Sequence, residues 1–227
     1  MSQDFNLVET VFGVVKFFIP FLFALCFHEY AHGIVAKMRG DRTAETMGRL
    51  TLNPFAHADM LGTFLLPIVS LLTNVPLFGW AKPVPVDERN LKNPRVDMFW
   101  IAAAGPLSNL LLAFIASFAL VFYMRTAGVA IASGDIGPMT IQEILVKFVT
   151  VNVYLAVFNM IPLHPLDGGK VLARFLPNDI NRKLEDMQQM TSMILLVLFA
   201  TGAIAVIAYP ARLVASLLLT IVSGVVG

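Results

Sequence analysis

Long apolar runs are the feature that most constrains how this chain can fold. About 20 apolar residues are enough to cross a bilayer as a helix, and the sequence offers such runs at about Val8–Ala36, Met98–Met124, Ile141–Ile161 and Met190–Ala208. Of the 227 residues, 57% are hydrophobic and 14% are charged, whereas a soluble domain has about 25% charged residues. The sequence therefore predicts a polytopic membrane protein.

Two further apolar runs are harder to interpret. Leu61–Leu72 contains Gly62 and Pro67 and is too short to span, which favours a re-entrant or interfacial piece. Ala211–Val226 predicts a short final helix, and its length does not decide whether that helix crosses the bilayer.

Two polar segments have the pattern of short strands. Met47–Leu52 alternates between apolar and polar residues. Gly79–Asp87 carries prolines at alternate positions, which keep it extended and confine it to a sheet edge or the surface. The predicted fold is an all-α helical bundle of about five to six transmembrane segments, with a re-entrant stretch and short membrane-associated β-strands. We expect a single domain over residues 1–227, with a core at 8–177 and additional C-terminal helices at 188–226.

Basic residues predict the orientation of this bundle. If Leu61–Leu72 re-enters, 12 of the 16 Lys and Arg residues share one side of the membrane; if it crosses, the first eight divide four and four. The positive-inside rule therefore favours re-entry, with the N-terminus outside and the end of the first span near the cytoplasm. The twelve are Lys37, Arg39, Arg42, Arg49, Lys82, Arg89, Lys92, Arg95, Lys170, Arg174, Arg182 and Lys183. The net charge of +1 gives no reason to expect a nucleic-acid partner.

Two histidines and a glutamate interrupt the first apolar run. His28 and His32 are four residues apart, so a helix places both imidazoles on one face, where a single divalent metal can bridge them. Glu29 points about 100° away and is better placed to hold a water than to ligate. A charge at the centre of a spanning helix costs roughly 2.5–3.5 kcal/mol. The pattern favours the chemistry of a zinc hydrolase over a polar cluster that serves helix packing.

A catalytic zinc site normally has three protein ligands and one open position. Asp167 is the best third candidate, because it follows the span Ile141–Ile161 and returns to the depth of His32. Gly168 and Gly169 beside it would let the backbone pack close to the metal. A role for Asp167 as a helix N-cap remains the alternative.

Two other histidines compete for the metal. His57 follows a turn at Asn53-Pro54, and His164 is three residues from Asp167. Pro162 and Pro165 hold that chain extended, so the side chains of His164 and Asp167 need not face one ion. A position at the loop surface or behind the ligands is the favoured alternative for both histidines.

Three motifs together resemble the site-2 protease family of intramembrane zinc metalloproteases. They are HEYAH at residues 28–32, GPLSN at 105–109 and NMIPLHPLDG at 159–168. Their order, spacing and membrane context are similar to those of the short bacterial and archaeal members, over roughly residues 21–177. The larger members carry a PDZ domain or a CBS pair, and neither fits in this chain.

This resemblance implies a role for individual residues. His28, His32 and Asp167 would ligate one Zn²⁺ per chain, and Glu29 would act as the general base. Asn159 would help to position the scissile peptide or its oxyanion, and Asn109 would bind substrate or support the core. The location implied is a prokaryotic cell membrane, with the active site towards the cytoplasmic side.

The predicted function is an intramembrane zinc metalloendopeptidase that hydrolyses peptide bonds within or near the transmembrane helices of its substrates. Because a helix hides its carbonyls, the substrate must unwind, and the extended segments near Leu50 and Val84 would offer it a free edge. The alternatives are a metal-binding or metal-transport membrane protein and a catalytically silent homologue that binds helices. The physiological substrate, the cleavage site, the regulation and the oligomeric state do not follow from the sequence.

Overall fold

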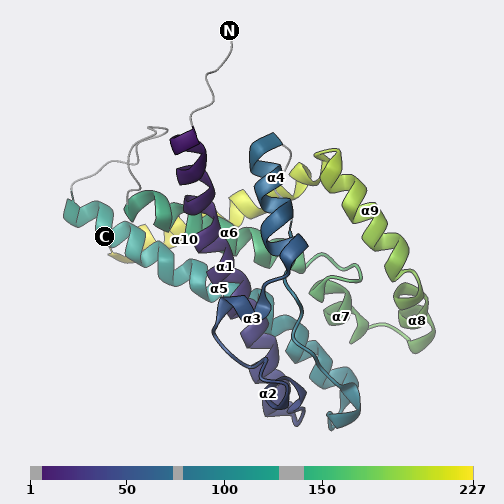
Figure 1. The fold of residues 1–227 in the computed structure, drawn as a ribbon. Coiled ribbons are helices and arrows are strands. Elements are labelled where there is room, and N and C mark those ends of the chain that lie inside the picture. The colour runs from purple at the N-terminus through teal and green to yellow at the C-terminus, as the bar shows by residue number, and fades with distance from the viewer. Residues whose placement is uncertain (1–6, 74–78, 128–140, 227) are drawn as a thin grey trace.

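The computed structural model describes residues 7–73, 79–127 and 141–226, and this part of the chain is helical, without a strand (Figure 1). Its longer helices are α1 (Leu7–Arg39), α5 (Pro94–Ala127), α6 (Ile141–Asn159), α9 (Gln188–Ala200) and α10 (Ala208–Val226). Its shorter ones are α2 (Thr43–Thr46), α3 (Pro54–His57), η1 (Met60–Leu65), α4 (Leu66–Thr73), η2 (Glu88–Asn90), α7 (Asp167–Ala173), α8 (Asn178–Asp186) and η3 (Ala203–Ile207).

Four stretches of the described residues are long and apolar enough to cross a membrane. They are Val15–Arg39, Pro94–Ala127, Ile141–Asn159 and Ala205–Val225. The expected count of five to six spans is therefore not confirmed. The run predicted to span at 190–208 is broken at Gly202, whose φ of 74° lies in the left-handed region that ends helices. The final apolar run, in contrast, has the length of a span.

The run predicted to be re-entrant forms a π-helix, η1, followed directly by α4. Together they are shorter than the roughly 20 residues that a spanning helix needs. The Asp59 carboxylate caps this unit by accepting the backbone N–H groups of Leu61 and Gly62, at 3.0 and 2.7 Å. Whether the unit re-enters the membrane stays a prediction.

The two predicted strands are absent from the described residues. Residues 47–48 form a turn, residues 51–52 form a bend, and no strand lies between them. Residues 79–87 lie extended, but the N–H groups of Trp80 and Lys82 donate to the Gly62 and His57 carbonyls instead of to a strand. Prolines at 83 and 85 remove the backbone donors on the opposite edge. The alternating pattern therefore produced an extended segment without a sheet partner.

Helix α5 is the centre of the bundle and packs against α1, α6, α7 and α10. Its contact with α6 and α10 is built around the buried alanines Ala113, Ala116 and Ala211. Between α1 and α6, Ala24 is fully buried beside Phe21. Small residues at these crossings let the helix backbones approach closely.

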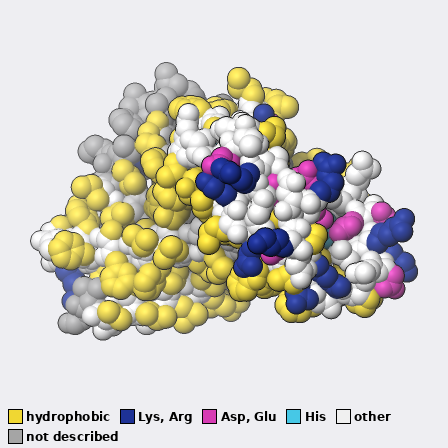
Figure 2. Space-filling view, turned by 90° about the horizontal axis from the view of Figure 1, so that it is seen from below, with side chains coloured by type: hydrophobic (Ala, Val, Ile, Leu, Met, Phe, Trp, Pro, Cys, Tyr) yellow, Lys and Arg dark blue, Asp and Glu magenta, His cyan; other side chains and the backbone are white. Residues whose placement is uncertain are grey.

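The surface separates into an apolar part and a charged part. In Figure 2, the molecule is seen from below, and hydrophobic side chains cover one end while Lys, Arg, Asp and Glu gather at the other. Many of the exposed hydrophobic residues lie on helices of the candidate spans, including Leu111 and Ile115 on α5 and Leu217 and Ile221 on α10. A surface of this kind fits contact with lipid.

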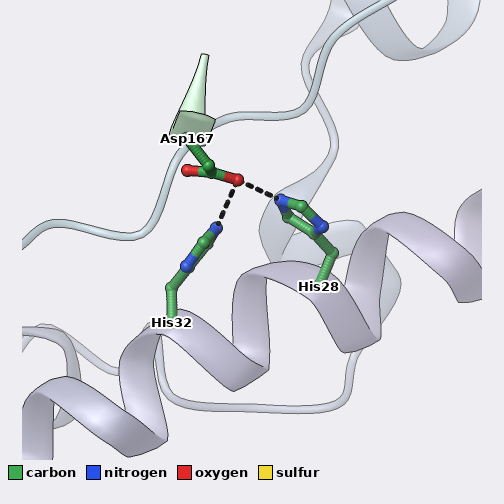
Figure 3. Close-up of side chains that lie close together, drawn as sticks. All are labelled: His28, His32 and Asp167. Carbon is green, nitrogen blue, oxygen red and sulfur yellow. Dashed lines mark ion pairs between the residues drawn. The ribbon is translucent and has the colours of Figure 1, made fainter. Parts of the chain in front are cut away.

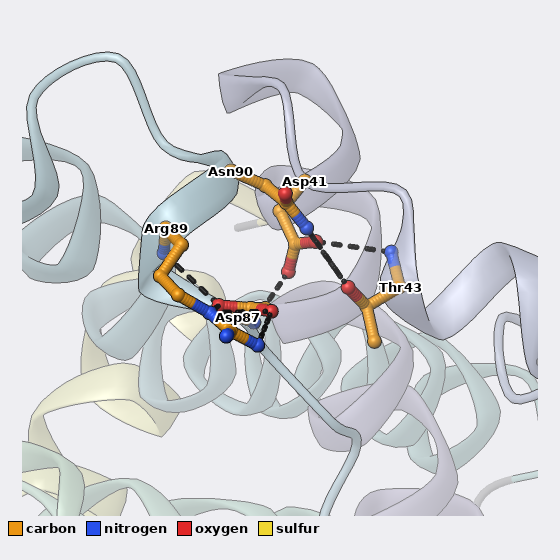
Figure 4. A network of polar contacts seen from close by, with 5 residues as sticks. All are labelled: Asp41, Thr43, Asp87, Arg89 and Asn90. Carbon is orange, nitrogen blue, oxygen red and sulfur yellow. Dashed lines mark hydrogen bonds and ion pairs between the residues drawn. The ribbon is translucent and has the colours of Figure 1, made fainter.

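A buried carboxylate ties the two loops at the charged end together (Figure 4). Asp41, which is fully buried, accepts hydrogen bonds from the backbone N–H of Asp87 at 2.8 Å, from Asn90 Nδ2 at 2.9 Å and from the N–H of Thr43 at 3.0 Å. Burial alone would raise the pKa of Asp41, but these hydrogen bonds outweigh it and hold the pKa below its ordinary value. The Asp41 anchor therefore fixes the end of the extended segment 79–87.

We expect acid to loosen this anchor. Because the pKa of Asp41 is lowered in the folded state, its stabilising effect is complete above about pH 4 and is lost as the pH falls through the folded value. Hydrogen exchange at the Asp87 N–H, corrected for intrinsic rates, should be unchanged between pH 7 and 5 and faster below pH 4. Asp41→Asn should raise exchange about tenfold already at pH 7, since hydrogen bonds to a charged group contribute about 1.5–3 kcal/mol. Pronounced loosening of the wild type near pH 6 would contradict this assignment.

Candidate metal centre

His28 and His32 lie one turn apart on the buried face of α1. Both are at most 9% exposed, and their ring centroids are 4.6 Å apart. The spacing of four residues produces this arrangement directly, because a helix advances 3.6 residues per turn. The sequence prediction that the two imidazoles share a face is confirmed by this geometry.

Asp167 is brought to the imidazole pair by the turn that follows α6. Its carboxylate Oδ2 lies 3.1 Å from His28 Nε2 and 3.3 Å from His32 Nε2 (Figure 3). Asp167 is the first residue of α7, and the N-cap position belongs to Leu166, so Asp167 is not the N-cap that was considered. Among the described residues, His28, His32 and Asp167 form the one group of three or more His, Cys, Asp or Glu residues able to hold a metal ion.

The glycines after Asp167 act differently from the prediction. A Cβ on Gly168 would lie 2.5 Å from the Met160 carbonyl oxygen, and one on Gly169 would lie 2.7 Å from the His164 backbone nitrogen. Both glycines therefore let α7 fold back onto the preceding loop rather than approach the metal. By this packing they hold Asp167 in place.

The hydrogen bonds made by the Nδ1 atoms of the two imidazoles fix the tautomers of both rings. His32 Nδ1 lies 2.6 Å from the Ile101 carbonyl, which can only accept, so Nδ1 carries the proton. His28 Nδ1 lies 2.6 Å from Asn109 Oδ1. The Asn109 amide is oriented by its Nδ2, which donates to the Ala24 carbonyl at 3.0 Å, so Asn109 also presents an oxygen and His28 Nδ1 is the donor. Both Nε2 atoms are thus left as acceptors that face Asp167.

This convergence of acceptors fits a metal ion. Two imidazole lone pairs and a carboxylate oxygen face one another, and Asp167 Oδ2 is buried without a hydrogen-bond partner among the described residues. Such a buried set is unfavourable unless a cation lies among the three atoms. Two nitrogens and one oxygen, each imidazole held through its other nitrogen, are the ligand set and the support of a catalytic zinc site.

The pKa of Asp167 suits an anionic ligand. Burial by itself would raise the pKa of Asp167, but its contacts with the imidazoles of His32 and His28 outweigh burial, and the pKa lies well below its ordinary value. The carboxylate is therefore ionised at neutral pH and available as an anionic ligand.

Glu29 is buried beside this cluster and is held by the extended segment. Its Oε2 accepts the backbone N–H of Val84 at 2.7 Å. Because a carboxylate has two oxygens, this bond orients the group and leaves Oε1 for another proton-bearing partner. The Val84 donor was missed by sequence reasoning, since a backbone N–H leaves no mark on residue type.

The two predicted substrate-binding asparagines lie in different places. Asn159, at the end of α6, lines the cavity described below and donates from Nδ2 to the Leu155 carbonyl at 3.0 Å. Asn109 is fully buried behind His28 and is not among the cavity-lining residues. It supports the core, which was the other role expected for it.

Neither competing histidine joins the cluster in the described part of the chain. His57 is buried near the extended segment and donates from Nε2 to the Thr51 carbonyl at 2.8 Å. His164 is also buried, and burial lowers its pKa. Close spacing to Asp167 in the sequence did not bring His164 into the group.

Gly105 is the residue of α5 that lies against the imidazole pair. A Cβ at this position would lie 2.5 Å from His32 Nε2 and 2.6 Å from His28 Nε2. The missing side chain is therefore what lets α5 pass the two ligand nitrogens.

A cavity of about 730 Å³ opens in front of the cluster. It is lined by residues of α1, the 79–86 segment, α5, α6, α7 and α9, and it includes His28, Glu29, His32 and Asp167. Most of the other lining residues are apolar, among them Phe21, Trp80 and Phe158. An apolar chamber with a few converging polar groups is typical of a ligand or active site.

Comparison with known proteins identifies relatives across most of the chain. The model of Peptidase family M50 matches residues 16–201. A protein of Bacillus subtilis (strain 168) named "Putative zinc metalloprotease YwhC" is 35% identical over 192 residues, which are 85% of this chain and 83% of that protein. "Putative zinc metalloprotease Rip2" of Mycolicibacterium smegmatis is 27% identical over 184 residues, which are 81% of this chain and 66% of Rip2. No solved structure is significantly similar.

Proposed function

The chain belongs to peptidase family M50, and from this membership we propose that it is a multi-pass membrane zinc metalloprotease that cleaves peptide bonds within or near transmembrane helices. The observation that carries the proposal is the meeting of three buried acceptor atoms, from His28, His32 and Asp167, beside the carboxylate of Glu29. We assign the three residues as ligands of one zinc ion and Glu29 as the general base.

Zinc bound there supplies a Lewis acid that polarises the scissile carbonyl and lowers the pKa of water towards about 7. Glu29 takes a proton from the attacking water through the oxygen that Val84 does not occupy. As the C–N bond breaks, Glu29 returns this proton to the amine nitrogen of the leaving peptide. The water oxygen stays in the new carboxyl group, so the reaction is balanced without another reactant.

Other residues of the cavity hold the substrate. Asn159 lies where its amide can contact the peptide that enters the chamber, and the apolar walls suit a segment taken from a membrane helix. The extended segment 79–87 turns the N–H groups of Trp80, Lys82 and Val84 towards the protein. An unwound substrate that pairs with its other edge would therefore meet mostly carbonyl acceptors, because Pro83 and Pro85 have no N–H.

The whole chain, residues 1–227, forms one metalloprotease domain in this proposal. Residues 8–177 hold the catalytic core, and residues 188–226 add C-terminal helices. The N-terminus lies outside a prokaryotic cell membrane and the active site lies towards the cytoplasm, as the distribution of basic residues predicts. We also propose that the chain crosses the membrane a fifth or sixth time and that residues 61–72 re-enter it.

Zinc dependence tests this function. Protein purified in detergent should contain about one zinc per chain, and it should cleave a transmembrane model substrate. A strong chelator should abolish cleavage and lower the thermal midpoint, because free zinc at a hundred times its Kd stabilises the folded state by about 2.7 kcal/mol. Added zinc should restore both. Zinc binding without cleavage of any membrane substrate would favour the alternative of a metal-binding or metal-transport protein.

A further inference from the structure

A ladder of buried amides runs behind His28 and joins three helices. Asn109 on α5 and Asn152 on α6 are both fully buried. Asn109 contacts His28 at 2.6 Å on one side, and its Nδ2 donates to Asn152 Oδ1 at 2.9 Å on the other. Asn152 in turn donates from Nδ2 to the Phe148 carbonyl at 2.9 Å. Asn152 does not line the cavity and has no place in the mechanism above.

In each hydrogen bond of this ladder, only one of the two groups can be the donor. The Phe148 carbonyl can only accept, so the nitrogen of Asn152 faces it and the oxygen of Asn152 faces Asn109. Asn109 must then donate towards Asn152 and towards the Ala24 carbonyl, which uses both hydrogens of its amide nitrogen. Only the oxygen of Asn109 is left for His28, and it requires the proton on Nδ1.

We infer that Asn152 is a positioning residue for the metal centre, which acts through Asn109 to keep the Nε2 of His28 unprotonated and directed at Asp167. This inference rests on the proposed function. Without the acceptor on Asn152, the amide of Asn109 loses one of the contacts that distinguish its oxygen from its nitrogen. A flipped amide would present N–H groups to His28 and favour the tautomer that cannot bind metal through Nε2.

Zinc affinity measured by chelator competition tests this inference directly. Asn152→Leu, which has a similar volume and no polar atom, should weaken zinc binding about tenfold, at the lower end of the 10- to 100-fold typical of residues that support metal ligands. The matched control is Ser117→Ala. Ser117 is as deeply buried, and in the described part of the chain its side chain bonds only within α5, to the Ala113 carbonyl at 2.8 Å, so its removal should leave zinc affinity unchanged.

A double-variant cycle separates positioning from general destabilisation. Asn109→Ala alone should weaken zinc binding, and adding Asn152→Leu to it should have no further effect, because the route from Asn152 to His28 is already cut. Additive losses in the double variant would overturn the inference. Thermal unfolding of the zinc-free proteins shows whether each variant folds; if Asn152→Leu does not, Asn152→Ser replaces it in the same cycle.

The failure of this inference is distinguishable from the failure of the proposed function. If the wild type binds zinc and Asn152→Leu binds it equally well, the positioning role is wrong and the metal site stands. If the wild type binds no zinc, the metalloprotease proposal fails, and the positioning role fails with it.

Discussion

Glu29→Gln should abolish proteolysis while zinc stays bound. The substitution removes the one group placed to take a proton from water, and general base catalysis contributes about 10²- to 10⁴-fold to a rate. Glutamine still has an oxygen that can accept the Val84 N–H, so the extended segment should keep its position. We expect kcat on a transmembrane model substrate to fall at least about a hundredfold, with zinc content and thermal midpoint close to those of the wild type.

A second Glu→Gln variant provides the control. Glu45 is an acceptor for Lys37 and Arg42 at the charged end of the molecule and does not line the cavity. Those two hydrogen bonds lower the pKa of Glu45 to about 2, so Glu45→Gln also removes a full charge at pH 7. Its activity should match the wild type. Cleavage retained by Glu29→Gln would remove Glu29 from the mechanism, and equal losses in both variants would indicate a nonspecific charge effect.

The parts of the site predicted from sequence are those that depend on local spacing or on a motif. His28 and His32 were placed together because helical periodicity relates residues four apart. Asp167 is 135 residues beyond His32 in the sequence, and no local pattern joins the two; the topology of the spans and the family resemblance did. The Val84 N–H and the Ile101 carbonyl were missed because backbone groups are identical at every residue.

In the fold, too, local sequence patterns predicted some features, and tertiary contacts determined the others. Apolar length predicted the helices α1, α5 and α6, but it did not predict the break at Gly202, because hydropathy does not report a positive φ. The alternating prolines of residues 79–87 correctly predicted an extended chain. They did not show that its backbone donors would be used by the Gly62 and His57 carbonyls, which is a tertiary contact. The alternating pattern of these residues therefore indicated an extended backbone here and not a sheet.

Gly105→Ala should remove the metal while leaving most of the fold intact. The new methyl would lie 2.5 to 2.6 Å from the two imidazole nitrogens that face Asp167. Contacts this short require one group to move, and the imidazoles are held from behind by Asn109 and the Ile101 carbonyl. Either the ligands separate or α5 shifts from α1. In both cases we expect zinc affinity to fall by about a hundredfold or more, the upper end of the losses caused by changes around metal ligands.

A matched substitution isolates the steric cause. Gly224 lies in α10, and a Cβ there would meet no atom of the described residues within 4 Å. Both changes replace a helical glycine by alanine, which by itself favours a helix by about 0.8–1.0 kcal/mol. Gly224→Ala should therefore keep full zinc affinity, whereas Gly105→Ala should lose it even where its zinc-free form unfolds at the same temperature. Equal zinc affinity in the two variants would mean that the imidazoles can rotate away from α5 and still bind, and the rigid support of His28 and His32 described above would then be wrong.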